Sequence, residues 1–189
     1  MTSLPTESRT SALAIALPPA LAVAPGPKAA LAHADTVETL KPGAARDAFR
    51  VGPILVAHAG MTARRLGLSP PARARDILDV LELYAFARPA RFCAPSPVGL
   101  AVALGLPDPR TLEAQANAMR LAAETLLAEL AAAPWPSREE TLAVAETLER
   151  AGWAWGPLAT QALRFEPATG KPWRSSGLDV WTRLKEWED

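Results

Sequence analysis

The first third of the chain has the hydrophobic pattern of a sheet. The stretch "ALAVAPGPKAALAHA", residues 20–34, holds two short apolar runs separated by Pro25-Gly26-Pro27, and this predicts two strands joined by a tight turn. "GAARDAFR", 43–50, predicts a short amphipathic helix. "PILVAHA", 53–59, is continuously apolar, which is typical of a strand buried on both faces. Such a strand needs helices above and below the sheet.

The pattern becomes helical after this strand. "RARDILDVLELYAFA", 73–87, predicts a helix with Asp76 at its N-cap and Asp79 as an acid near its positive end. Pro89 ends it. The apolar positions expected on one side of this helix are Ile77, Leu78, Leu81, Tyr84 and Ala85.

Three more helices are predicted further along. Residues 95–106 open with Ser96-Pro97 and close at Gly105, a C-terminal cap. Residues 108–133 form the longest helix, and 137–153 begin with a capping box in which Ser137 is the N-cap.

Together these elements predict an α/β fold, a mixed sheet flanked by helices with a C-terminal helical extension and tail. We expect a disordered N-terminus over 1–12, a sheet domain over 13–133, a helical extension over 134–169 and a linker or docking tail over 170–189. Trp153 and Trp155 are expected to be core residues under the extension.

Composition narrows the function classes. The 189 residues are 49% apolar, and 20 basic residues balance 20 acidic ones, so no global charge attracts nucleic acid or anionic membrane. The single cysteine, Cys93, excludes an internal disulfide framework and a cysteine-cluster metal site. The sequence has no unbroken run of about 18 apolar residues, so no membrane span is predicted. The apolar N-terminal run is broken by Pro18-Pro19 and lacks a basic leader, so a cytoplasmic location is predicted.

Two segments of the sequence resemble parts of a known nuclease domain. "DVLELYAFARP", 79–89, and the following "SPVGLAVALGL", 96–106, resemble segments of the DEDD (DnaQ-like) 3′–5′ exonuclease domain. The resemblance covers about residues 20–133. It implies an RNase H-like fold, with the strand ending at His58 next to the site.

A narrower resemblance concerns DNA helicases. "VAHAGMTARRLGL", "ERAGWAWGP" and "GLDVWTRLKEWED" are similar to the N-terminal region of alphaproteobacterial DinG-like, XPD-related ATP-dependent DNA helicases. That implies helicase motor domains as partners, in cis or in trans. ATP and Mg²⁺ would belong to those motors, because this sequence has no phosphate-binding loop of the Gly-x-x-x-x-Gly-Lys-Ser/Thr type.

The carboxylates that such an exonuclease needs are missing. Two-metal nucleases hold ions about 3.5–4 Å apart with several converging acids. The first strand, "ALAVAPGP", has none. We therefore expect no catalytic residues and no bound metal, and a non-catalytic accessory domain contributing DNA or protein contacts. The remnant positions implied by the resemblance are His58, Ala63, Asp79, Glu113 and Ala118, or Asn117 with a one-residue shift.

An active exonuclease with displaced carboxylates remains an alternative. Asp35 and Glu38, with Asp76 and Asp79, are the acids available, but a spacing of three does not place Asp35 and Glu38 on one face of a strand. His58 as a general base lacks a neighbouring partner in the sequence, so a hydrogen bond to nearby backbone is the favoured interpretation. Neither His33 nor Cys93 shows a catalytic pattern, and Cys93 is expected to be a partly buried structural thiol.

A second alternative is a pure protein-interaction module. Tryptophans that alternate with charges in the tail predict a partner-docking surface, and these are Trp173, Trp181 and Trp187. One group of basic residues is the candidate for holding single-stranded DNA, if its members converge on the vacated cleft. These are Arg64, Arg65, Arg73, Arg75, Arg88 and Arg91.

Overall fold

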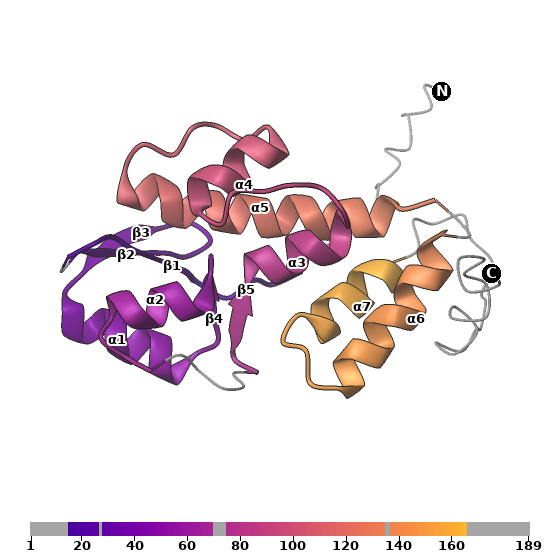
Figure 1. The fold of residues 1–189 in the computed structure, drawn as a ribbon, viewed down its shortest axis with the longest axis horizontal. Coiled ribbons are helices and arrows are strands. Elements are labelled where there is room, and N and C mark those ends of the chain that lie inside the picture. The colour runs from indigo at the N-terminus through magenta and orange to yellow at the C-terminus, as the bar shows by residue number, and fades with distance from the viewer. Residues whose placement is uncertain (1–14, 27, 70–74, 135–136, 166–189) are drawn as a thin grey trace, which may run out of the picture.

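A five-stranded mixed sheet lies between two layers of helices in the computed structural model (Figure 1), which describes residues 15–26, 28–69, 75–134 and 137–165. The strand order is β3-β2-β1-β4-β5. The strands are β1 (Ala20–Val23), β2 (Ala29–Ala32), β3 (Val37–Leu40), β4 (Ile54–Val56) and β5 (Ile77–Asp79).

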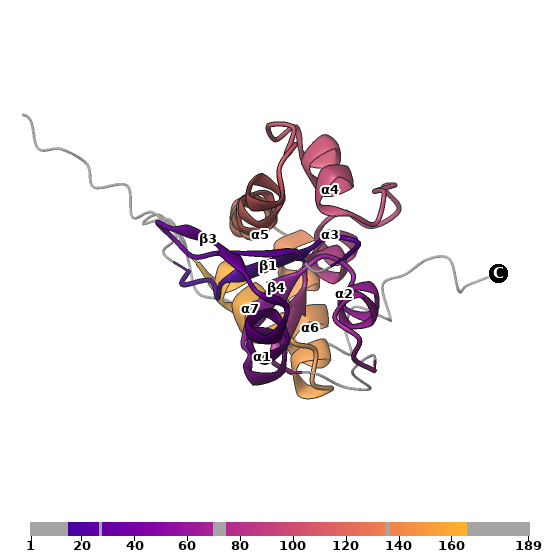
Figure 2. The same ribbon diagram turned by 90° about the vertical axis from the view of Figure 1, so that its left-hand side faces the viewer.

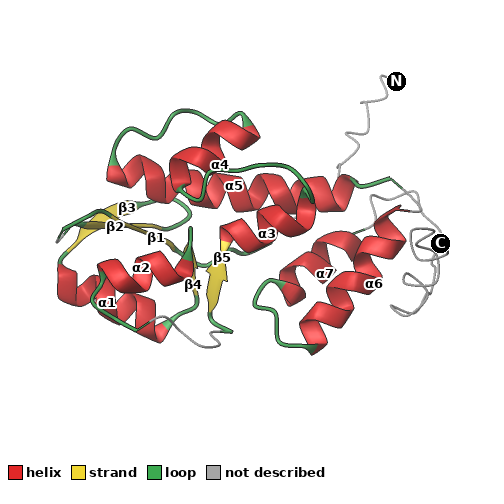
Figure 3. Cartoon of the chain, viewed as in Figure 1, coloured by secondary structure: helices red, strands yellow, loops and turns green. Residues whose placement is uncertain are grey.

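The first three strands form an antiparallel meander, and β4 and β5 join it in parallel beside β1. Figure 3 shows that most of the chain after β5 is helical. The helices of the described residues are α1 (Pro42–Val51), α2 (Ala59–Arg65), α3 (Val80–Ala87), α4 (Pro97–Leu104), α5 (Leu112–Ala132), α6 (Ser137–Arg150) and α7 (Gly156–Arg164).

Side-chain alternation gives the sheet two buried faces. In β4, Leu55 packs in the cluster that α3 to α7 cover, whereas Ile54 and Val56 pack in the cluster that α1 and α2 cover. Figure 2 shows α4 and α5 on one side of the sheet and α1 and α2 on the other. The prediction that "PILVAHA" holds a strand buried on both faces is therefore confirmed, although the strand is limited to three residues.

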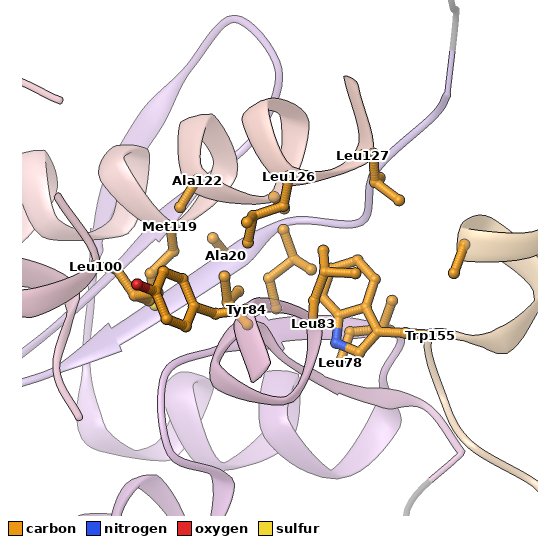
Figure 4. Packing of buried hydrophobic residues seen from close by; sticks show 14 of the residues in the cluster. Ala20, Leu78, Leu83, Tyr84, Leu100, Met119, Ala122, Leu126, Leu127 and Trp155 are labelled. Carbon is orange, nitrogen blue, oxygen red and sulfur yellow. The ribbon is translucent and has the colours of Figure 1, made fainter. Parts of the chain in front are cut away.

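Small residues bring the longest helix close to the sheet. On the face toward α5, the buried positions of β1 and β2 are all alanine. Helix α5 meets them with alanines of its own and with larger side chains such as Met119 and Leu126, which lie close to Ala20 in Figure 4. A sheet face without bulky side chains lets a helix axis approach closely while dense packing is kept.

The α6–α7 hairpin shares this core. Trp155 is fully buried, and Trp153 packs its ring against Phe86 with 4.9 Å between centroids. The Nε1–H of Trp153 also donates to Glu82 Oε2 at 3.1 Å. The prediction that both tryptophans lie under the helical extension is confirmed, Trp153 being only partly buried.

The predicted helix over 73–87 is wrong in its first part. Residues Ile77–Asp79 are strand β5, paired in parallel with β4. The apolar pair Ile77-Leu78 suits either element, but burying the two side chains on opposite faces of the sheet requires a strand. Helix α3 therefore starts at Val80, and its N-cap is Asp79 rather than Asp76.

Most other elements agree with the sequence. The 20–34 hairpin and the helices near 43–50 and 108–133 are present, and α4 is capped by Ser96 and by a left-handed Gly105, as predicted. The helix predicted over 137–153 ends at Arg150, and α7 follows it. Within the described residues, no helix combines the length and apolarity needed to cross a bilayer.

Candidate functional site

The carboxylate of Asp79 lies where two helices begin. Asp79 ends β5, next to the end of its parallel neighbour β4, and is only 8% exposed. Its Oδ1 accepts hydrogen bonds from the main-chain N–H groups of His58 at 2.9 Å and Leu81 at 3.1 Å. Its Oδ2 accepts one from the N–H of Ala59 at 2.6 Å. Three backbone donors therefore surround one buried carboxylate.

These donors belong to the first turns of α2 and α3. The N–H groups of a helix's first turn have no partner within the helix, and that end carries a partial positive charge. Parallel β4 and β5 each continue into a helix at the same edge of the sheet, so the two N-termini meet there. The Asp79 carboxylate satisfies both. The sequence predicted only that this acid favours the positive end of one helix, with Asp76 as the N-cap.

The backbone of His58, rather than its imidazole, contacts Asp79. His58 takes the left-handed conformation, with φ 65°, and is the N-cap of α2. Its Nδ1 accepts a hydrogen bond from the N–H of Met61 at 3.3 Å, and the residue is exposed. The prediction that this histidine bonds to neighbouring backbone is confirmed.

The other remnant positions lie on both sides of the sheet. Ala63 is fully buried in the α1–α2 layer, and Ala118 is buried on α5, which covers the other face. Glu113, in the first turn of α5, accepts a hydrogen bond from Thr39 Oγ1 at 3.1 Å. Its pKa is lowered, first by its own backbone N–H and then by this hydroxyl. The structure thus joins His58 with Asp79 and leaves the other three apart.

The acids of the displaced-site hypothesis do not gather either. Asp35 lies in the β2–β3 turn, and Glu38 is 3.5 Å from His33, which supplies the partner that the sequence did not reveal. Asp76 precedes β5, at the opposite end of that strand from Asp79. Among the described residues, no three His, Cys, Asp or Glu side chains are placed to hold a metal ion.

Two of the candidate DNA-binding arginines are engaged within the protein. Arg65 donates from Nη1 to the carbonyl of Val23 at 2.7 Å. Arg88 donates from Nε to Glu129 at 3.0 Å and from Nη1 to the carbonyl of Ala103 at 2.9 Å. The Glu129 bond raises the pKa of Arg88.

The remaining candidates are spread over the molecule. Arg64 is exposed on α2, Arg91 is exposed in the loop after α3, and the guanidinium of Arg75 lies against Gly152 in the α6–α7 connection. With Arg65 on one side of the sheet and Arg88 on the other, the group does not converge on a single cleft. Four predicted site residues lie outside the described residues, namely Arg73, Trp173, Trp181 and Trp187.

One contact near Arg64 was missed by sequence reasoning. Arg46 of α1 donates from Nε to the carbonyl of Leu66 at 2.7 Å, which holds α1 against the end of α2. Arg50 follows one turn later on α1. The sequence contained one signal for this contact region: Arg46 and Arg50 lie four residues apart in a predicted helix, a spacing that places them on the same helix face.

Cys93 has the environment predicted for a structural thiol. It is partly buried, its Sγ–H donates to the carbonyl of Ala94 at 3.3 Å, and burial raises its pKa. A raised pKa lowers the thiolate fraction at neutral pH, and the thiolate is the nucleophilic form.

Comparison of the chain with protein family models, with curated proteins and with solved structures gave no match.

Proposed function

We propose that this chain is a non-catalytic, exonuclease-like accessory module for an ATP-dependent DNA helicase motor of the DinG-like kind, joined to it in cis or bound in trans. The observation that carries the proposal is the bonding of Asp79. The buried acid at the remnant position accepts three main-chain N–H groups from two helices. Its oxygens are directed at backbone donors rather than into a space shared with other acids.

The fold is compatible with this proposal. A mixed sheet in the order β3-β2-β1-β4-β5, with a long helix across its antiparallel part, suits the RNase H-like fold that the sequence resemblance implies. The two remnant alanines, Ala63 and Ala118, have no side-chain oxygen or nitrogen that could bind a cation. Glu113 bonds to Thr39 of β3 instead.

Phosphodiester hydrolysis by this kind of nuclease needs two cations to neutralise the phosphate and to activate water. The described side chains offer no converging carboxylates for that step. What the scaffold does offer is a packed body of sheet and helices with exposed cationic side chains. Such a body can bind DNA or a motor domain and keep it in position, and we assign the module this positioning role.

The proposal is tested by measuring whether this chain changes the response of a helicase motor to DNA. The DNA-stimulated ATPase rate of a purified DinG-like helicase motor would be measured over a range of single-stranded DNA concentrations, with and without this chain. We expect the chain to lower the DNA concentration that gives half-maximal stimulation. An unchanged half-maximal concentration, together with no complex between chain and motor in sedimentation, would contradict the accessory role.

A further inference from the structure

Charge is divided unequally between the two helical layers. From Lys41 to Ser69, which includes α1 and α2, the chain has five cationic side chains and one acidic one, a formal charge of +4. From Leu112 to Phe165, which includes α5, α6 and α7, it has four arginines and seven glutamates, a formal charge of −3. A protein of zero net charge therefore has a basic α1–α2 layer, whereas the helices that pack in the other core cluster, α5 to α7, are together acidic.

The arginines of the two layers also differ in their partners. Of the four arginines between Leu112 and Phe165, Arg120 and Arg164 form ion pairs with glutamates, as does Arg88 at the end of α3. Arg138 bonds to the carbonyl of Leu163, and Arg150 bonds to Thr147. On the basic side, the arginines are exposed, and none of them forms an ion pair within the described residues. These are Arg46, Arg50, Arg64 and Arg65, which with Lys41 we call the α1–α2 surface.

Two hydrogen bonds order this surface. Arg46 donates one N–H to the carbonyl of Leu66, and Arg65 donates one to the carbonyl of Val23, each at 2.7 Å. A guanidinium has five N–H donors, so each of these groups is held by one donor and keeps others for a ligand. Arg64 lies on the last turn of α2, which runs beside α1 on the same side of the sheet in Figures 1 and 2.

We infer that the α1–α2 surface binds the phosphate backbone of nucleic acid. Guanidinium groups match phosphate oxygens in a fork geometry, and four of the five cations here are arginine. Phe49 is the one aromatic residue between Lys41 and Ser69, and it is buried at 5% exposure. The surface therefore offers cations for phosphate contacts and no exposed Phe, Tyr or Trp ring for base stacking, so we expect its binding to depend little on base sequence.

An acidic protein segment fits this surface less well. Protein interfaces have a desolvated centre enriched in aromatic residues, and the described residues of α1 and α2 include no exposed Phe, Tyr or Trp. The inference rests on the proposed function in one respect, that the module contacts nucleic acid. It adds that the contact face is the α1–α2 layer, on the side of the sheet away from α5.

Arginines at helix C-termini also have a structural effect. Arg50, Arg64 and Arg65 lie in the last turns of their helices, where a positive charge offsets the dipole. That effect contributes to folding stability and is measured separately from nucleic-acid affinity. The two roles are distinguished by comparing affinity and thermal unfolding in the same variants.

The test uses two charge-matched double variants of the full chain. Arg50→Glu with Arg64→Glu changes the α1–α2 surface at side chains that make no hydrogen bond within the described residues. Arg110→Glu with Arg150→Glu makes the same charge change at exposed positions elsewhere. The probe is fluorescent oligothymidylate, titrated between about 50 and 200 mM salt, with polyglutamate as a competitor.

We expect the first variant to bind oligothymidylate about tenfold or more weakly, and its slope of log affinity against log salt to fall by roughly 0.7 per lost contact. The second variant should bind like the native chain. Both variants should show a small fall in unfolding temperature, because Arg50, Arg64 and Arg150 each lie in the last turn of a helix. Equal loss in both variants, or loss in neither, overturns the inference while DNA contact by the module stands. Preference for polyglutamate over oligothymidylate also overturns it. If the two variants differ in DNA affinity as expected but the chain neither binds a helicase motor nor changes the DNA dependence of its ATPase rate, only the proposed function is overturned.

Discussion

The indole N–H of Trp155 donates a 2.7 Å hydrogen bond to the main-chain carbonyl of Asp79, the residue whose carboxylate caps α2 and α3. Trp155 precedes α7 and is fully buried. Asp79 therefore contacts the α6–α7 hairpin through its main-chain carbonyl and caps two helices through its side chain. The hairpin completes the same core as α3 and α5.

Trp155→Phe removes the donor and leaves the buried Asp79 carbonyl without this partner. An unsatisfied buried acceptor costs about 1–3 kcal/mol of folding free energy. Trp155→Ala also creates a cavity, for which about 3–5 kcal/mol is expected. Urea unfolding followed by circular dichroism measures both. A Phe variant with the native midpoint and slope would show that the hydrogen bond is not important for stability.

Asp79→Asn tests the double cap. The Asn amide keeps one acceptor oxygen, but its NH₂ group then faces a backbone N–H, so at least one donor loses its partner. We expect a loss of about 2–3 kcal/mol in unfolding free energy, because hydrogen bonds to a charged acceptor are involved. Asp76→Asn is the control, since that residue is exposed and its contact to Ile54 is made by its main-chain carbonyl. Equal stability of the two variants would count against the cap.

Glu82 and Glu113 are expected to respond to pH with opposite signs. The pKa of Glu82 is raised, mainly by burial and then by the charge of Asp79. The folded state then holds the proton more tightly, so this stabilisation is present below the ordinary carboxyl pKa and is lost as pH rises. The pKa of Glu113 is lowered, so its contribution is present above the ordinary pKa and is lost as pH falls.

Substitution by glutamine separates the two effects. At pH 7, Glu82→Gln should raise the midpoint of urea unfolding slightly, and Glu113→Gln should lower it slightly. Both differences should disappear in acid, where the native carboxyl groups are protonated. The measurement is a set of urea titrations from about pH 3 to pH 7 on the three proteins. Shifts of the same sign at neutral pH would contradict this assignment.

Local signals made several elements predictable. Pro25-Gly26-Pro27 between two apolar runs indicated the β1–β2 hairpin, and Ser96 with Gly105 indicated both ends of α4. These features depend on backbone preferences of residues that are neighbours in sequence. The His58 contact to backbone was predictable for the same reason, because its partner Met61 is three residues away.

Features that depend on distant contacts were not predictable. Ile77 and Leu78 fit a helix until β4 offers them a strand to pair with, and the exposed residues of β3 show no apolar alternation that marks a strand. The basic residues were grouped by closeness in sequence, which joined Arg65 with Arg88 although they lie on opposite sides of the sheet. The same grouping omitted Arg46, whose nearness to α2 arises from folding.

The non-catalytic role of the chain is tested by incubating the purified protein with end-labelled single-stranded DNA and Mg²⁺ or Mn²⁺. We expect no degradation above that of the metal-free control at any metal concentration, because the Asp79 carboxylate is bonded to backbone N–H groups and the other described acids do not converge on it to hold a metal. Metal-dependent shortening of the DNA that disappears in Asp35→Asn or Asp79→Asn proteins that remain folded would contradict it.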